Sequence, residues 1–107
     1  MQSISRGSTP LLTFTTPYER DLITRGFITF KQHSKIALDI PVDDYRVTIK
    51  DNAIELRLTQ EDTLKLVSEP SVYTVEIQVR LILGADTAVT SNIFTASVEE
   101  ILKDGVI

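Results

Sequence analysis

The chain has 107 residues, the length of one domain, a net charge of −4 at pH 7 and no cysteine. A negative net charge argues against a nucleic-acid-binding surface, because affinity for phosphates depends mainly on basic charge. The absence of cysteine excludes thiolate metal ligands, thiol catalysis and disulfide bonds. No apolar run approaches the ~20 residues that a membrane helix needs, so we expect no membrane partner.

The first half of the chain predicts a flexible arm and three strands. Residues 1–8 are polar and small, and they lack the apolar segment of a secretion signal, so they predict the arm. Residues 9–107 then predict a single β-sandwich domain. Apolar and polar residues alternate in the three segments, a period that is typical of half-buried strands. The segments are residues 10–16, 26–32 and 35–40, with Ile28, Phe30, Ile36, Leu38 and Ile40 facing inward.

The middle of the chain predicts a hairpin, one helical turn and a long strand. Residues 45–50 and 54–59 alternate like strands, and Asp51 and Asn52 between them tolerate the positive φ of a tight turn. Thr59 and Asp62 fit a reciprocal helix cap, so a short helical turn is expected near residues 60–66. Pro70 stops any helix. Residues 72–83 then predict the longest strand.

The last part of the chain predicts a seventh strand and a tail with two alternatives. Residues 88–98 alternate, but their inward phase shifts near Ser91 and Asn92, as a β-bulge would produce. Ser97 and Glu100 form a capping pattern for a short helix, and an extended tail is equally plausible. Seven short strands with frequent turn signals indicate an all-β protein, an antiparallel β-sandwich.

Metal and nucleophilic sites have little support in the residue pattern. His33 is the only histidine and no nucleophile-elbow glycines are present, so a plain turn histidine is the simpler interpretation. Zinc requires several His or Cys ligands. Four acids could meet at one end of the sandwich and offer oxygen ligands to calcium: Asp39, Asp43, Asp44 and Asp51. No Asp-x-Asp-x-Asp loop is present, so we expect solvated acids and no cofactor.

Two glutamates suggest a carboxylate pair of the glycosidase type. Glu55 and Glu76 are expected on neighbouring strands, but the separation that this chemistry requires cannot be read from a sequence. Arginines are expected on the same outward faces, so cross-strand ion pairs are the simpler account. These arginines are Arg46, Arg57 and Arg80. We therefore expect no enzymatic activity and no small-molecule substrate.

Two segments are candidates for binding other proteins. The tail holds four large apolar residues: Ile101, Leu102, Val106 and Ile107. Apolar residues gathered at one edge indicate a partner surface, and a tail folded over its own sandwich is an equal alternative. The first strand, with Leu12 and Phe14, is rich in threonine, as edge strands often are. An open edge can pair with another chain through backbone groups alone.

Two segments resemble a known group of proteins. Residues 56–64 read Leu-Arg-Leu-Thr-Gln-Glu-Asp-Thr-Leu, and residues 75–80 read Val-Glu-Ile-Gln-Val-Arg. The pairing resembles small immunoglobulin-like proteins encoded among phage and prophage tail genes of low-GC Gram-positive bacteria. It is more distantly similar to the N-terminal domain of upper baseplate proteins of lactococcal siphophages. Leu-x-x-Glu-Asp-Thr also resembles the corner before one strand of immunoglobulin variable domains, but the chain lacks their cysteines and tryptophan.

The resemblance implies an immunoglobulin-like sandwich in a non-enzymatic structural or accessory module of phage tails or baseplates. Its partners would be itself or other tail proteins, with no nucleic acid and no membrane. It would be cytoplasmic when synthesised and then virion-associated. The alternative is a carbohydrate- or cell-surface-binding module, whose exposed aromatics would be Tyr18, Tyr45 and Tyr73. A small-heat-shock or co-chaperone-like sandwich is a third hypothesis, suggested by the acidic β character and by residues 43–47.

Overall fold

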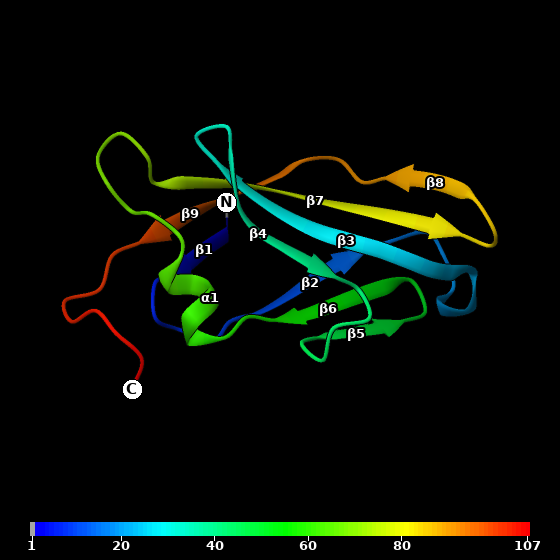
Figure 1. The fold of residues 1–107 in the computed structure, drawn as a ribbon, viewed down its shortest axis with the longest axis horizontal. Coiled ribbons are helices and arrows are strands. Elements are labelled where there is room, and N and C mark those ends of the chain that lie inside the picture. The colour runs from blue at the N-terminus through cyan, green and yellow to red at the C-terminus, as the bar shows by residue number, and fades with distance from the viewer. Residues whose placement is uncertain (1) are drawn as a thin grey trace.

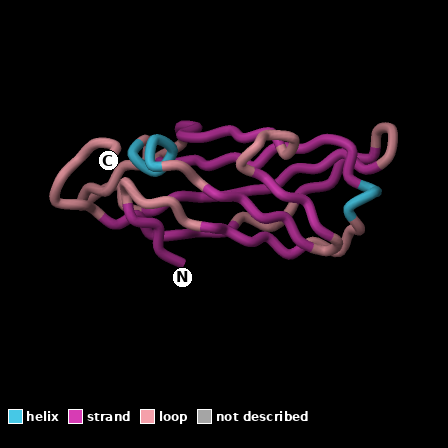
Figure 2. Tube along the Cα trace, turned by 90° about the horizontal axis from the view of Figure 1, so that it is seen from below, coloured by secondary structure: helices cyan, strands magenta, loops and turns pink. Residues whose placement is uncertain are grey.

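Two β-sheets face each other in the computed structural model, which describes residues 2–107 (Figure 1). The strands are β1 (Gln2–Ser5), β2 (Leu11–Thr15), β3 (Ile23–Gln32), β4 (Lys35–Pro41), β5 (Val47–Lys50), β6 (Ala53–Arg57), β7 (Thr74–Leu83), β8 (Thr87–Thr90) and β9 (Phe94–Glu99). A 3₁₀ turn (Arg20–Leu22) precedes β3, and the short helix α1 (Gln60–Leu64) follows β6. Both termini lie toward the end of the sandwich that carries α1 (Figures 1 and 2).

The strand order is that of an immunoglobulin-like sandwich. One sheet has the order β1-β9-β7-β3-β4, with β8 also paired to β7, and the other has the order β2-β6-β5. This corresponds to the B-E-D strands of immunoglobulin domains packed against the G-F-C strands, with β1 and β4 added at the two edges of the second sheet. The predicted fold class is therefore confirmed. Two details were wrong: the described residues form nine strands instead of seven, and β1 pairs with β9 in parallel.

Strand β1 corrects the prediction that residues 1–8 form a flexible arm. It pairs with β9 so that Ile4 lies opposite Val98. Ile4 is completely buried, and this one apolar side chain docks an otherwise polar segment on the core. Gly7, with a φ of 78°, then lets the chain turn toward β2 in the other sheet. Met1 lies outside the described residues.

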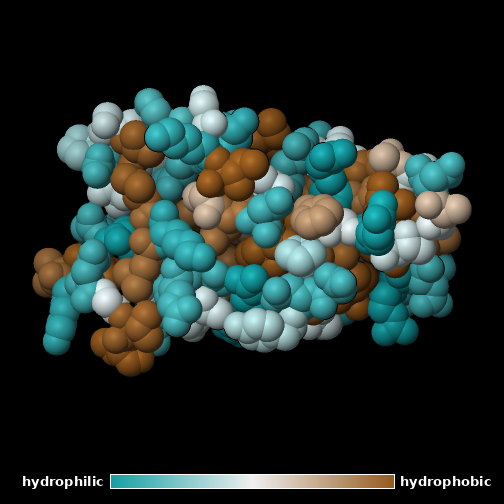
Figure 3. Space-filling view, in the orientation of Figure 1, coloured by the Kyte–Doolittle hydropathy of each residue, from teal (hydrophilic) through white to brown (hydrophobic). Residues whose placement is uncertain are grey.

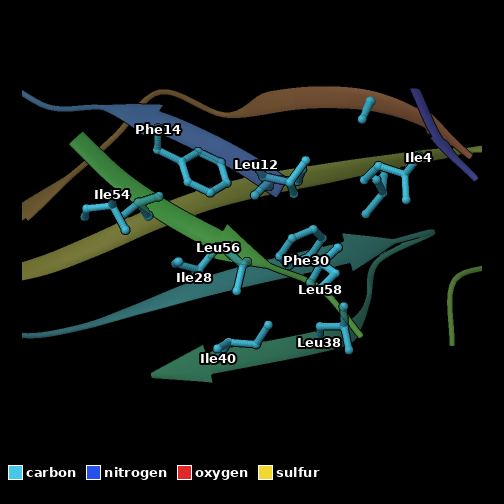
Figure 4. Packing of buried hydrophobic residues seen from close by; sticks show 14 of the residues in the cluster. Ile4, Leu12, Phe14, Ile28, Phe30, Leu38, Ile40, Ile54, Leu56 and Leu58 are labelled. Atoms are coloured by element: carbon cyan, nitrogen blue, oxygen red, sulfur yellow. The ribbon is translucent and has the colours of Figure 1, made fainter. Parts of the chain in front are cut away.

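The core lies between the sheets, where apolar side chains point toward one another (Figure 4). Alternation predicted part of it correctly: Ile28, Phe30, Leu38 and Ile40 were expected to face inward and are buried. Leu12, Phe14, Ile54 and Leu56 from the other sheet are buried as well. Ile36 was expected inward and is 62% exposed. The register between β3 and β4 shifts after Phe30, which places Ile36 opposite Lys31 on the outer face.

The predicted helical turn is confirmed as α1. The Asp62 N–H donates to the Thr59 hydroxyl over 3.1 Å, and the Thr59 N–H donates to the Asp62 carboxylate over 2.9 Å. This reciprocal cap satisfies two backbone donors at the start of the helix. Asn52 has a φ of 62°, as the expected turn between β5 and β6 requires.

The predicted seventh strand is divided in two. β8 and β9 both pair with β7, and residues 91–93 between them leave the sheet. The Ser91 hydroxyl accepts the Val79 N–H over 2.9 Å, so a side chain replaces a strand carbonyl there. The break falls where a single-residue bulge was expected. Beyond β9, residues 100–107 form no helix, so the extended alternative describes the tail.

Gly26 is expected to be intolerant of substitution because its inward side is filled. A Cβ at this position would lie 2.5 Å from the Arg80 carbonyl oxygen and 2.7 Å from Leu81 Cδ2. We expect Gly26→Ala to lower the free energy of unfolding by about 1–3 kcal/mol, measured by urea denaturation. Gly84→Asn is the control: nothing lies within 4 Å of a Cβ there, and asparagine tolerates its φ of 60°. Equal stability of the two variants would contradict the close approach.

Candidate functional site

The C-terminal tail, residues 100–107, is tied to the end of the sandwich near α1 (Figure 1). The Arg6 guanidinium donates to Glu100 over 2.7 Å and to Asp104 over 2.6 Å. It also donates to the backbone carbonyls of Leu64, at the end of α1, and of Leu66, just after it. The hydrogen bond to Asp104, followed by that to Glu100, raises the pKa of Arg6 above its usual value. The Gln60 side chain also binds the Ile107 backbone.

The structure separates the four apolar tail residues that were predicted as a partner surface. Ile101 is half-buried and lies beside Gly7. Leu102 and Ile107 are fully exposed, and Val106 is more than half exposed. Hydrophobic side chains protrude at this end of the molecule (Figure 3). The tail therefore folds back at Ile101 and leaves three apolar side chains in solvent; their binding to a partner stays a prediction.

Strand β2 forms one edge of the three-stranded sheet and, within residues 2–107, pairs with β6 alone. Leu12 and Phe14 face the core, so they anchor the strand and are not offered to a partner. The Phe14 ring lies 5.7 Å from that of Phe94 in β9, measured between centroids. Any added strand would bind to backbone groups of β2, and this also stays a prediction.

A hollow of about 390 Å³ opens beside this edge, next to the break between β8 and β9. Hydroxyl-bearing and apolar side chains line it, among them Thr16, Val89 and Ser91. Tyr18 is the one lining residue with a titratable side chain. General acid–base catalysis needs a proton donor or acceptor that is positioned together with other catalytic groups, and among residues 2–107 no second such side chain lines the hollow beside Tyr18. The hollow has room for a small molecule but offers no catalytic set.

The acids considered as calcium ligands are engaged separately. Three of them accept hydrogen bonds from three different neighbours: Asp39 from the Thr29 hydroxyl, Asp44 from the Arg46 guanidinium and Asp51 from the Arg20 backbone. Asp43 is exposed in the loop after β4. Among residues 2–107, no group of three His, Asp or Glu side chains could hold a metal ion. His33 lies in the turn after β3, as predicted, with a φ of 49°.

Glu55 and Glu76 do not lie on neighbouring strands, so that prediction was wrong. Glu55 is in β6 of the three-stranded sheet and Glu76 in β7 of the other, so the carboxylates lie on opposite outer faces. The connection through α1 crosses from one sheet to the other, which strand alternation does not reveal. Glu55 pairs with Lys50 over 3.0 Å, and Arg57 donates to the Thr9 carbonyl. The expected glutamate–arginine pairs across strands are absent from the described residues.

The tyrosines considered for carbohydrate binding lie in three different connections. Tyr18 is half-buried between β2 and β3, and Tyr73 is 55% exposed just before β7. Tyr45 is 85% exposed before β5, with the Arg46 guanidinium 5.7 Å from its ring centroid. No two of these rings stack on each other in the described chain. They therefore offer no shared aromatic platform for a sugar.

The outer face of the six-stranded sheet exposes large apolar side chains beside charged ones. Phe27 in β3 is 49% exposed, Ile36 in β4 is 62% exposed, and Ile93 beside β7 is 57% exposed. Two shallow hollows of about 200 Å³ and 190 Å³ lie between such side chains. The alternation of β3 and β7 predicted which residues face outward, but not that these two strands are neighbours.

The arginines distinguish this face from the rest of the molecule. Three arginines donate to a neighbouring carboxylate or carbonyl within the chain, namely Arg6, Arg46 and Arg57, and Arg20 forms an ion pair with Asp21 at 3.8 Å. The other two, Arg25 and Arg80, lie on this outer face and make no side-chain hydrogen bond or ion pair within residues 2–107. Arginine beside exposed apolar side chains is typical of protein interfaces.

These surfaces belong to an immunoglobulin-like β-sandwich. No family model and no curated protein matches the chain. Among solved structures it is similar to Drosophila OTK, extracellular domains 3–5, with 14% identity and a TM-score of 0.40. The match covers 96% of this chain and 33% of that chain, so this chain spans about a third of its length. Within residues 2–107, no helix is long and apolar enough to span a bilayer.

Proposed function

We propose that the chain is a non-enzymatic protein-interaction module, a structural or accessory component that assembles with itself or with phage tail or baseplate proteins. The observation that carries the interaction role is the outer face of the six-stranded sheet. There Phe27 and Ile36 are exposed, and Arg25 and Arg80 have no partner within the described residues. Buried in an interface, such side chains would contribute most of the binding energy.

The phage context rests on the resemblance of residues 56–64 and 75–80 to small immunoglobulin-like tail-associated proteins. Two further features suit an assembly role. The backbone of β2 is open along one side, and the apolar residues at the chain end protrude from the sandwich (Figure 3). Each offers a contact that a neighbouring subunit would bury.

Peptide mass spectrometry of purified phage particles tests this function. Particles would be induced from the strain that encodes the chain, and we expect the chain at a level comparable to that of the tail proteins. An abundant cytoplasmic protein of the host, quantified in the same sample, controls for carry-over. Infectious particles that contain the chain only at the carry-over level would contradict a virion role.

A further inference from the structure

We propose that a second copy of this chain docks on the outer face of the six-stranded sheet, related by a two-fold axis that runs along β3 and β7 and between them. This inference deepens the proposed function. It rests on one part of that proposal, that the chain acts by assembling with other proteins. It is carried by the order of outward side chains along the two strands.

The outward residues of β3 and β7 form three cross-strand pairs in successive rows. The pairs are Lys31 with Glu76, Thr29 with Gln78, and Phe27 with Arg80. The two members of each pair are of complementary chemical type, namely a cation and an anion, a hydroxyl and an amide, and an aromatic ring and a guanidinium. Within the chain the Thr29 hydroxyl donates to Asp39 and the Gln78 amide to the Ser91 carbonyl. The face is therefore complementary across its own midline.

With a two-fold axis along this midline, the same complementary contacts form twice, once between β3 and the partner's β7 and once between β7 and the partner's β3. In an isologous interface, if one residue contacts a second on the partner, the second contacts the first on the partner. With the axis between the strands, each residue of β3 lies opposite the partner's copy of its own cross-strand neighbour. Lys31 then faces the partner's Glu76, Thr29 the partner's Gln78, and Phe27 the partner's Arg80.

The charges support a second copy as the occupant. Lys31 and Glu76 form no ion pair within the described residues, although their strands are adjacent. In the docked pair, two lysines and two glutamates would alternate around a square, with unlike charges on every side and like charges on the diagonals. Such complementarity fixes register and rejects wrong partners.

Shape and area agree with this occupant. Phe27 protrudes beside the hollow of about 200 Å³ that Arg80 and Ile82 help to line, so the ring can enter the same hollow of the partner. A standard interface covers about 800 Å² on each partner. That is about an eighth of the molecular surface of 6728 Å², which one face of a molecule measuring 45 × 27 × 20 Å can supply.

Mixing two charge-reversal variants tests the arrangement. Light scattering after size exclusion should give wild type a mass of twice 12.0 kDa. Lys31→Glu brings four negative charges together and Glu76→Lys brings four positive ones, so each variant alone should dimerise at least about tenfold more weakly. An equimolar mixture should form a heterodimer, because each glutamate again faces lysines. Lys65→Glu, an exposed lysine after α1, is the matched control and should dimerise like wild type.

Each contrary result overturns the inference. Wild type that stays monomeric up to about 1 mM has no such interface. Loss of the dimer by Glu76→Lys but not by Lys31→Glu excludes the stated axis, and a mixture that stays monomeric excludes the alternating charges. Melting temperatures near that of wild type establish that the variants are folded. A dimer that is missing from phage particles would contradict the proposed function alone, and a monomer found in particles would contradict this inference alone.

Discussion

Phe30→Ala is expected to lower the free energy of unfolding by about 3–5 kcal/mol, the loss that is usual when a fully buried phenylalanine is truncated. Phe30 has no exposed surface, and its ring lies between the two sheets near Leu58 (Figure 4). β3 pairs with β4 on one side and β7 on the other, so the backbone cannot move in to close the cavity. The truncation therefore loses both the burial of the ring and the contacts of its neighbours.

The same strand offers a matched control. Phe27→Ala removes the same atoms three residues earlier, where the side chain is 49% exposed on the outer face. We expect a loss of no more than about 0.5 kcal/mol in urea denaturation, as for most surface substitutions, together with weaker dimerisation. Phe30→Ala should instead cause a large loss in the free energy of unfolding, because its side chain faces the core and not the dimer interface. Similar losses of stability in the two variants would contradict the assignment of Phe27 to the solvent face.

Alternation along the chain located the core because both sheets bury one face. It identified Phe30 in β3 and Ile40 in β4 as inward residues, and both are buried. It missed β1, because Ile4 stands alone among polar residues and is held only by pairing with β9. It misplaced Ile36, because a register shift between β3 and β4 leaves no mark on the pattern of either strand.

At the candidate interface, too, alternation could not predict which residues are neighbours, here because they lie far apart in the sequence. The sequence indicated that Glu76 and Arg80 face outward, but not which strand lies beside theirs. Lys31 and Glu76 are neighbours only because β3 pairs with β7, a contact between residues 45 positions apart. The mistaken pairing of Glu55 with Glu76 has the same cause. Local periodicity gives the face of a residue, whereas its neighbours depend on the order of strands.

Asp62→Ala is expected to lower the free energy of unfolding by about 3 kcal/mol, because it breaks a buried ion pair. Asp62 is 3% exposed, and its carboxylate accepts from the Arg46 guanidinium over 2.6 Å and from the Thr59 N–H over 2.9 Å. The substitution also leaves the Thr59 N–H, one of the two donors in the reciprocal cap of α1, without its acceptor. Arg46 keeps one carboxylate, that of Asp44, 2.8 Å away, so the loss should fall at the low end for broken buried pairs.

The two carboxylates also predict how stability depends on pH. Burial tends to raise the pKa of Asp62, but hydrogen bonds from Thr59 and Arg46 outweigh it, so the pKa lies below its usual value. The hydrogen bond from Arg46 likewise lowers the pKa of Asp44. A lowered pKa in the folded state stabilises the protein above the unfolded value of about 3.9, and this stabilisation is lost as the pH falls through the folded pKa.

Wild type should therefore lose stability below about pH 4, and the difference between wild type and Asp62→Ala should shrink there. Urea denaturation at pH 7 and at successive lower values measures both. Asp62→Asn isolates the charge, because its amide oxygen can still accept the Thr59 N–H that caps α1. Asp86→Ala, in the exposed turn between β7 and β8, is the control and should leave the curve unchanged. A constant difference between wild type and Asp62→Ala down to acid pH would mean that the ionised carboxylate contributes nothing, and that the substitution acts through packing alone.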